Sequence, residues 1–153
     1  MLTPEIKHYI DHCVLCWLAT CNAALVPNVS PKEVFTYAGD HTLLIADIAS
    51  AGSVRNVEQN PNVCVSFVEV FIQKGFKLIG KARVLRPGDA DFAPSLERLL
   101  PLVSEEFPIR SIFSIDVQRT ERILAPSYFL FPDTTEEQQI ESALKLYHVE
   151  RKV

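Results

Sequence analysis

The residues best suited to chemistry lie between Ser50 and Asn60. Ser50 to Ser53 are small or hydroxyl residues, and Ser53, Arg55 and Asn56 open a short helix that Asn60-Pro61 must end. A loop of small residues that enters a helix offers free backbone N–H groups and the positive end of the helix dipole, which suits a phosphate. The pattern therefore predicts a phosphate site with Ser53 as the N-cap and with Arg55 and Asn56 beside it. An ordinary capped surface helix is the alternative interpretation.

The segments around this helix occur in a recognisable order. WLAT, a turn at Asn22-Ala23-Ala24, PNVSPK, TLLIADI, SVRN, NPNVCVSF and GFKLIGKARV follow one another between Leu15 and Leu85. This order resembles the FMN-binding split-barrel family of pyridoxamine phosphate oxidase-like proteins. The resemblance implies FMN as the cofactor and a split β-barrel as the fold.

The resemblance also implies which residues contact the flavin. Ser30, Pro31 and Lys32 would lie along one edge of the flavin ring, and Lys32 would place a charge near its N1–C2 side, which favours reduced flavin. Ala46, Asp47 and Ile48 would touch the ring or the ribityl chain. The alternatives are a solvated strand lysine at position 32 and a simple turn residue at Asp47.

The charge partner of the phosphate is less clearly marked. Many relatives carry a basic residue just before the hydroxyl residue, whereas this chain has Gly52 there. Lys74 or Lys77 could supply the charge instead, from the same chain or from a partner. Gly80, within a strand, indicates close packing against another backbone.

The elements that must position these residues are mostly strands. Thr3 caps a predicted helix that starts at Pro4, and the tail is a predicted helix with Asp133 as cap and Glu136 at the capping-box position. A further helix is predicted over Asp89 to Ser104. Alternation of apolar and polar residues predicts six strands, which are Val14 to Thr20, Val29 to Tyr37, Thr42 to Ala46, Asn62 to Val68, Phe76 to Val84, and Phe113 to Val117 with an extension to Leu124.

Six strands with short connections favour closure into a barrel over an open sheet with long edges. The expected fold is therefore mainly β (α+β), a six-stranded antiparallel split β-barrel with short flanking helices. No repeat, low-complexity tract or linker divides the chain, so residues 1–153 are expected to form one domain.

Composition excludes several classes of protein. The net charge of −4 and the pI near 5.5 provide no excess positive field for nucleic acid. No segment has the length and apolarity of a membrane span, and the N-terminal residues are too polar for a secretory signal. We therefore expect a cytoplasmic protein that binds neither nucleic acid nor membranes, with its four cysteines as reduced thiols.

A metal site is the rival hypothesis for one cluster. His8, His12, Cys13 and Cys16 have a suggestive spacing, and the two histidines share one helix face. Cys13 and Cys16 would point to opposite faces of the following strand, however, so no compact four-ligand site forms without a bend. We expect no metal. No nucleophilic triad or carboxylate pair is present either, so no catalytic side chain is predicted.

Two functions remain. The first is a small FMN-dependent oxidoreductase that acts on an unidentified small molecule, and the second is a non-catalytic FMN-binding carrier, sensor or stress-related protein. A barrel that has lost its cofactor is a third interpretation, allowed by Gly52. The tail lacks the arginine-bearing segment of true pyridoxamine phosphate oxidases, which disfavours vitamin B6 oxidation. A homodimer with the flavin at its interface is expected because apolar residues are more numerous than one small domain can hide, among them Phe71, Ile72, Phe76, Phe129 and Phe131.

Overall fold

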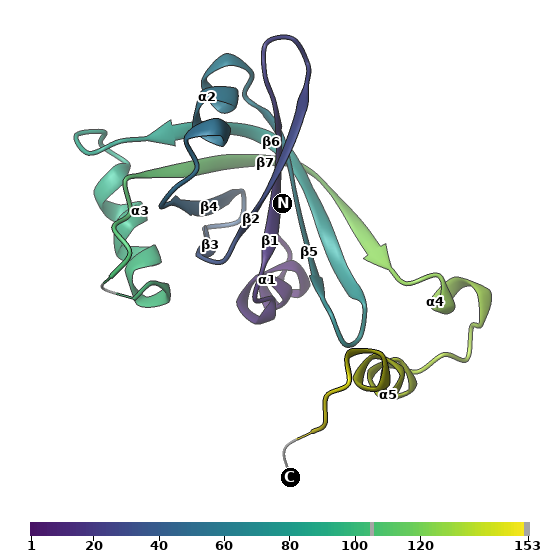
Figure 1. Ribbon diagram of the computed structural model, residues 1–153. Helices are drawn as coiled ribbons and strands as arrows, with labels where there is room; N and C mark the ends of the chain where they lie inside the picture. Colours follow the sequence, from purple (N-terminus) through teal and green to yellow (C-terminus); the bar gives the residue numbers. More distant parts are fainter. Residues whose placement is uncertain (105, 152–153) are drawn as a thin grey trace.

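Seven antiparallel strands form a single curled sheet (Figure 1). The computed structural model describes residues 1–104 and 106–151. The strands are β1 (Cys16–Cys21), β2 (Pro27–Lys32), β3 (Phe35–Ala38), β4 (Thr42–Asp47), β5 (Asn62–Glu69), β6 (Lys74–Leu85) and β7 (Ser111–Leu124). The helices are α1 (Pro4–His12), α2 (Ala51–Gln59), α3 (Phe92–Leu99), α4 (Ser127–Leu130) and α5 (Glu136–Tyr147), with a 3₁₀ turn, η1, at Leu100–Leu102.

The prediction of six strands was wrong at one place. The single strand expected from Val29 to Tyr37 is two strands, β2 and β3, which are interrupted at Glu33 and Val34. These two strands lie at opposite edges of the sheet, whose order is β2-β1-β5-β6-β7-β4-β3. Because only Glu33 and Val34 join the two edges, the sheet must curl until its edges approach each other. The split-barrel fold class is confirmed, with seven strands.

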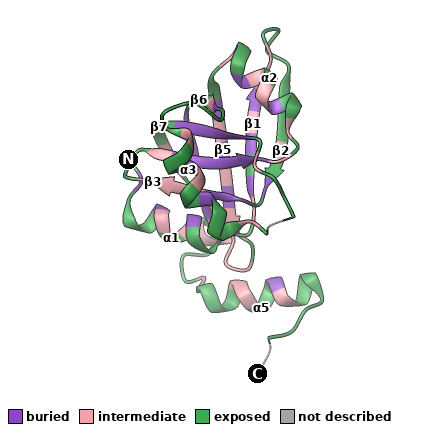
Figure 2. Cartoon of the chain, turned by 90° about the vertical axis from the view of Figure 1, so that its left-hand side faces the viewer, coloured by how far each residue is buried: buried purple, intermediate pink, exposed green. Residues whose placement is uncertain are grey.

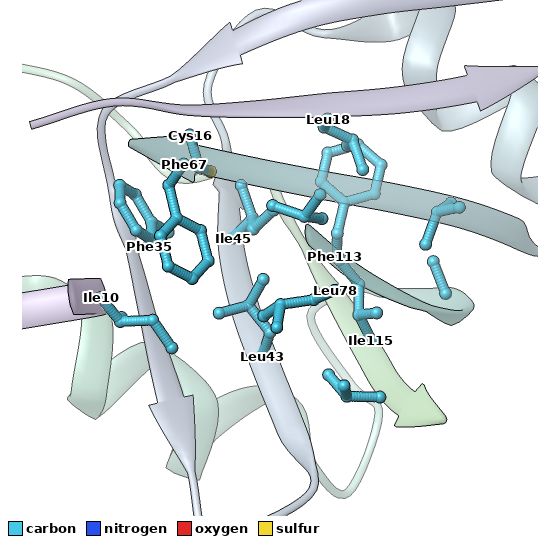
Figure 3. Close-up of a cluster of buried hydrophobic side chains, with 14 of the residues drawn as sticks. Ile10, Cys16, Leu18, Phe35, Leu43, Ile45, Phe67, Leu78, Phe113 and Ile115 are labelled. Carbon is cyan, nitrogen blue, oxygen red and sulfur yellow. The ribbon is translucent and has the colours of Figure 1, made fainter. Parts of the chain in front are cut away.

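The main hydrophobic core lies inside the curled sheet. Alternate residues of the strands point inward, and Figure 3 shows Phe67 of β5 beside Phe35 of β3, with ring centroids 6.3 Å apart. Ile6 and Ile10 of α1 belong to the same cluster and are only 2% and 3% exposed. Helix α1 therefore closes this part of the core, and its predicted start with Thr3 as cap is confirmed because Thr3 Oγ1 accepts the Ile6 N–H.

Strand β4 is buried on both faces. Leu43 and Ile45 face the main core, while Leu44 and Ala46 belong to a second cluster that includes Leu99 of α3. In Figure 2 the central strands carry buried residues in alternation with intermediate ones, whereas β2 is largely exposed. A strand covered on both faces reads as a continuous apolar run, which explains the sequence LLIA of β4.

The helix ends correct two expectations. In α5 the cap is Thr135, and its capping-box partner is Gln138, so the expected Asp133 and Glu136 were two residues too early. Helix α3 ends at Leu99, before Pro101, and is shorter than the predicted segment. Among the described residues, no helix combines the length and apolarity needed to cross a membrane.

Candidate functional site

The segment that leaves β4 and enters α2 is held by Asp47. Its Oδ1 accepts the Ser50 N–H at 2.8 Å, and its Oδ2 accepts the Ser111 hydroxyl at 2.7 Å. Asp47 is 6% exposed, so these bonds satisfy a carboxylate that water barely reaches. The N-cap of α2 is Ser50, three residues before the predicted one, so the prediction of Ser53 as the cap was wrong. The bonds of Asp47 set the path of the chain into the helix.

A first cavity of about 430 Å³ lies against this segment. Predicted flavin contacts from two strands meet in it, since Pro31 and Lys32 come from β2 while Ala46 and Ile48 come from β4 and the residue after it. The cavity is also lined by the segment that follows α3, with Leu102 of η1 and then Val103, Ser104 and Phe107. The curl of the sheet therefore brings together residues that the sequence placed in separate strands.

Lys32 is the buried cation of this cavity. It is 7% exposed, and its Nζ donates to Ser50 Oγ. Burial lowers the pKa of Lys32 below its ordinary value of 10.5, and the nearby Asp47 carboxylate opposes that shift. Lys32 is thus a desolvated charge at the cavity wall rather than the solvated strand lysine of the alternative interpretation.

Strand β2 is an edge strand, and one of its faces is polar. Asn28, Ser30 and Lys32 alternate along it and so share a face. That face meets α2, because Ser30 Oγ lies 3.1 Å from Ser53 Oγ and Asn28 Nδ2 donates to the same oxygen at 3.4 Å. The outer edge of β2 has no neighbouring strand within the described residues, so its backbone groups on that side are open to a ligand.

Ser53 belongs to a group of neutral polar side chains that we call the hydroxyl cluster. Ser53 is 3% exposed. The Asn56 Nδ2 donates to Thr20 Oγ1 at 3.0 Å, and Asn28 Nδ2 donates to the same oxygen at 3.3 Å. The cluster comprises Thr20, Asn28, Ser30, Ser53 and Asn56. Two of the three predicted phosphate residues are therefore together, joined to β1 and β2.

Arg55, the third, lies elsewhere. It lines a second cavity of about 550 Å³ together with Arg86 and Arg110, beside the start of α2. Sequence reasoning missed Arg86 and Arg110, because residues 55, 86 and 110 are far apart in the chain and no spacing rule connects them. The segment Asp47 to Ser50 lies between the two cavities, and Ile48, Ala49 and Ser50 line both.

Lys74 and Lys77 line neither cavity. Lys74 Nζ forms an ion pair with Glu136 at 2.7 Å and lies 4.5 Å from the centre of the Tyr128 ring, and the hydrogen bond to Glu136 raises the pKa of Lys74. Lys77 Nζ pairs with Glu121 at 2.5 Å. Within one chain, the structure does not bring either lysine to the other predicted site residues.

Gly80 lies at a β-bulge between β6 and β7. A Cβ at this position would lie 2.0 Å from the Asp116 carbonyl oxygen. The predicted close backbone packing is present, and it belongs to the sheet rather than to either cavity.

The histidine and cysteine residues are arranged by α1 and β1. His8 and His12 are exposed with ring centroids 4.1 Å apart, whereas Cys13 and Cys16 are buried. Burial raises the pKa of the Cys13 thiol to about 11 and that of Cys16 further. In the part of the chain that the structure describes, no group of three or more His, Cys, Asp or Glu residues is placed to hold a metal ion.

Comparisons with known proteins show the family and the fold. The sequence model of the pyridoxamine 5'-phosphate oxidase family matches residues 2–124. A search of curated proteins finds no match.

Solved structures share the fold at low sequence identity. HupZ from Group A Streptococcus is 23% identical with a TM-score of 0.68, and the alignment covers 78% of this chain and 92% of that one. An FMN-binding protein from Syntrophomonas wolfei is 12% identical with a TM-score of 0.68, covering 79% and 85%. HutZ, the heme storage protein from Vibrio cholerae, is 23% identical with a TM-score of 0.63, covering 80% and 94%. These similarities establish the fold, while the descriptions of two of these proteins name different ligands, FMN and heme.

Proposed function

The chain belongs to the pyridoxamine 5'-phosphate oxidase family, and from this membership we propose that it binds FMN and acts as a small oxidoreductase on an unidentified small molecule. The observation that carries the proposal is the first cavity, where Pro31, Lys32, Ala46 and Ile48 from two strands line one space. Bound FMN would supply the electron transfer, and the protein would hold and orient it.

We place the flavin ring in the first cavity. Lys32 would hold a positive charge beside the ring. Asp47 would position Lys32 indirectly, because it fixes Ser50, to which the Lys32 Nζ donates. A cation near the N1–C2 side of a flavin stabilises the extra electron density of the reduced state. Loop residues Leu102 and Phe107 would limit access of water to the ring.

We place the phosphate at the hydroxyl cluster. Lys32 and Asn28 are four residues apart on one face of β2, which spans about 13 Å. An extended FMN molecule has a similar length, so a ring at Lys32 puts the phosphate near Ser30 and Asn28, where the Ser53 hydroxyl supplies a further donor. That Lys74 or Lys77 adds charge to this phosphate stays a prediction, whereas Arg55, the other predicted partner, lines the second cavity on the far side of α2.

We also propose that the protein is a homodimer with the flavin at the interface. A single curled sheet leaves one side of an edge-bound cofactor uncovered. Phe129 and Phe131 are 68% and 66% exposed and are available to an interface. Phe76 is 6% exposed and belongs to the core, so the expectation that it contributes to an exposed apolar surface was wrong. The outer face of β1 and β2 adds Trp17 and Val29, which are 46% and 56% exposed.

Absorption spectra and calorimetry of the purified protein test the proposal. FMN should bind more tightly than riboflavin or FAD, because only FMN ends in a phosphate monoester. Haem is the comparison ligand, since HutZ shares the fold. Riboflavin binding as tightly as FMN would contradict the phosphate site, and haem binding without flavin binding would overturn the proposal.

Turnover separates the two functions. An oxidoreductase should have its FMN reduced by NADH or NADPH and reoxidised by an added acceptor over many cycles. Tightly bound FMN that neither nicotinamide reduces would support the alternative, a non-catalytic carrier, sensor or stress-related protein.

A further inference from the structure

The second cavity is distinguished by its charge. Three arginines, Arg55 of α2, Arg86 after β6 and Arg110 before β7, line one space of about 550 Å³. Arginine presents a planar set of donors that matches the oxygens of a phosphate, and several arginines at one cavity make a much stronger anion site than one. The start of α2, at Ala51, lines the same cavity and adds the positive end of the helix dipole.

The acidic side chains near this cavity do not neutralise the positive charge of all three arginines. Asp47 lines it, but its two oxygens accept from Ser50 and Ser111, and Lys32 is close enough to interact with its charge. Glu58 forms an ion pair with Arg86. Among the ion pairs of residues 1–104 and 106–151, none involves Arg55 or Arg110.

The cavity lies on the other side of α2 from the proposed FMN phosphate site, although Asp47 and Ile48, two of the predicted flavin contacts, line it. The hydroxyl cluster joins α2 to β1 and β2, and none of its members lines the second cavity. The backbone of Ile48 to Ser50 forms a shared wall with the first cavity, so a ligand in the second would lie next to a ligand in the first.

We propose that Arg55, Arg86 and Arg110 form a binding site for the phosphoryl group of a second ligand, distinct from the FMN phosphate. That the ligand is a second one rests on the proposed FMN site. Two sources share this chemistry, a free inorganic phosphate or diphosphate and the phosphate of a phosphorylated nicotinamide donor. Glu58 is the internal counter-ion that occupies Arg86 when the cavity is empty of anions.

The experiment measures binding of inorganic pyrophosphate by calorimetry at fixed, low ionic strength, with and without FMN. Arg86→Gln and Arg110→Gln should each weaken pyrophosphate binding at least tenfold and leave FMN affinity within twofold. Glu58→Gln should tighten pyrophosphate binding, because it releases Arg86. The matched control is Arg119→Gln, an exposed arginine of β7 that does not line the cavity, and it should change neither affinity.

Each other outcome overturns the proposal. Pyrophosphate that does not bind, or binds equally to the Arg86, Arg110 and Arg119 variants, removes the site. Parallel losses of FMN and pyrophosphate affinity in the Arg86 and Arg110 variants would show that the cavity holds the FMN phosphate. Because pyrophosphate binding is also measured without FMN, failure of the flavin proposal alone leaves the anion measurement intact.

Electron-donor preference, measured in the natural protein and in the same variants, distinguishes the two sources of the phosphate. A preference for NADPH over NADH as electron donor that disappears in Arg110→Gln assigns the site to the donor. Equal use of both donors that Arg110→Gln leaves unchanged, with pyrophosphate binding retained in the natural protein, assigns it to a free phosphate or diphosphate.

Discussion

Lys32 is the residue on which the ring site depends, because it carries its charge where water barely reaches. Its Nζ bonds to Ser50 Oγ, and Asp47 holds Ser50 in place. A desolvated cation costs stability in the protein alone and becomes useful only when a ligand brings electron density to it. Lys32 is therefore expected to lower the stability of the protein without ligand and to strengthen the binding of the flavin.

The first prediction follows from the lowered pKa of Lys32. Between that pKa and the ordinary value of 10.5, the unfolded chain binds more protons than the folded one, so stability rises with pH in this alkaline range. Lys32→Met should therefore be more stable than the natural protein at neutral pH, with a difference that shrinks as the pH approaches 10.5. Denaturant unfolding at several pH values measures this, and a difference that does not change with pH would contradict it.

The second prediction concerns Ser53. Its buried hydroxyl contacts Ser30 and Asn28, so Ser53→Ala should cost about 1 kcal/mol in the absence of flavin and should also reduce the stabilisation that FMN adds. Thermal unfolding with and without FMN measures both effects. Ser142→Ala, at an exposed position of α5, is the control. If FMN stabilises the Ser53 variant as much as the natural protein, Ser53 has only a structural role.

At the scale of elements, the contact between β6 and β7 is the longest in the sheet. The two strands pair from Lys74 and Leu124 to Leu85 and Ile112, with one bulge at Ile79 and Gly80. The pairing places Arg86 just beyond the end of β6 and Arg110 just before β7, so both arginines meet at the same end of the strand pair. The bulge lets the long pair bend with the curl of the sheet.

The third prediction tests this contact. Gly80→Ala would place a methyl group 2.0 Å from the Asp116 carbonyl oxygen, so the strands must separate, and we expect a loss of more than about 2 kcal/mol in unfolding free energy. Gly52→Ala is the control, because no atom lies within 4 Å of its Cβ position and alanine favours a helix. It should be neutral or stabilising by up to about 1 kcal/mol. A Gly80 variant as stable as the Gly52 variant would contradict the close approach.

At the scale of the whole molecule, the edges of the sheet stay open. Strand β2 pairs only with β1 in the described chain, and the face of these two strands that points away from the core carries Trp17, Val29 and Pro31. The α4–α5 segment extends away from the barrel in Figure 1. The outer face of β1 and β2 therefore exposes apolar side chains next to the proposed ring site. A second copy of the chain that packed on this face would cover the face and the ring together.

The fourth prediction is that Trp17→Glu shifts the protein from dimer to monomer and weakens FMN binding, because a charge on the outer β1–β2 face, near the end of β2 that carries Lys32, opposes burial of that face. Light scattering across a wide concentration range measures the mass, and flavin fluorescence measures the affinity. Leu146→Glu on α5, a residue that is 68% exposed, is the control and should change neither. A monomer mass for the natural protein with flavin bound would contradict the interface.

The sequence by itself determined features that depend on near neighbours in the chain. Alternation from Asn62 to Val68 predicted β5, and Thr3 with Pro4 predicted the start of α1, because side-chain periodicity and capping are local. The order of the motifs was sufficient for the family. The break between β2 and β3 was not predictable, because residues on both sides of Glu33 and Val34 favour strands and only closure of the barrel requires the chain to cross between sheet edges.

Only the tertiary structure decided the composition of the two cavities. It put Ser53 and Arg55, two residues apart in α2, on different sides of the helix. It also brought Arg86 and Arg110 to the side on which Arg55 lies. The reason is that a helix turns its side chains by about 100° per residue, while strand order decides what each side meets. Short-range pattern therefore predicted the elements, and long-range strand pairing decided which charges share a cavity.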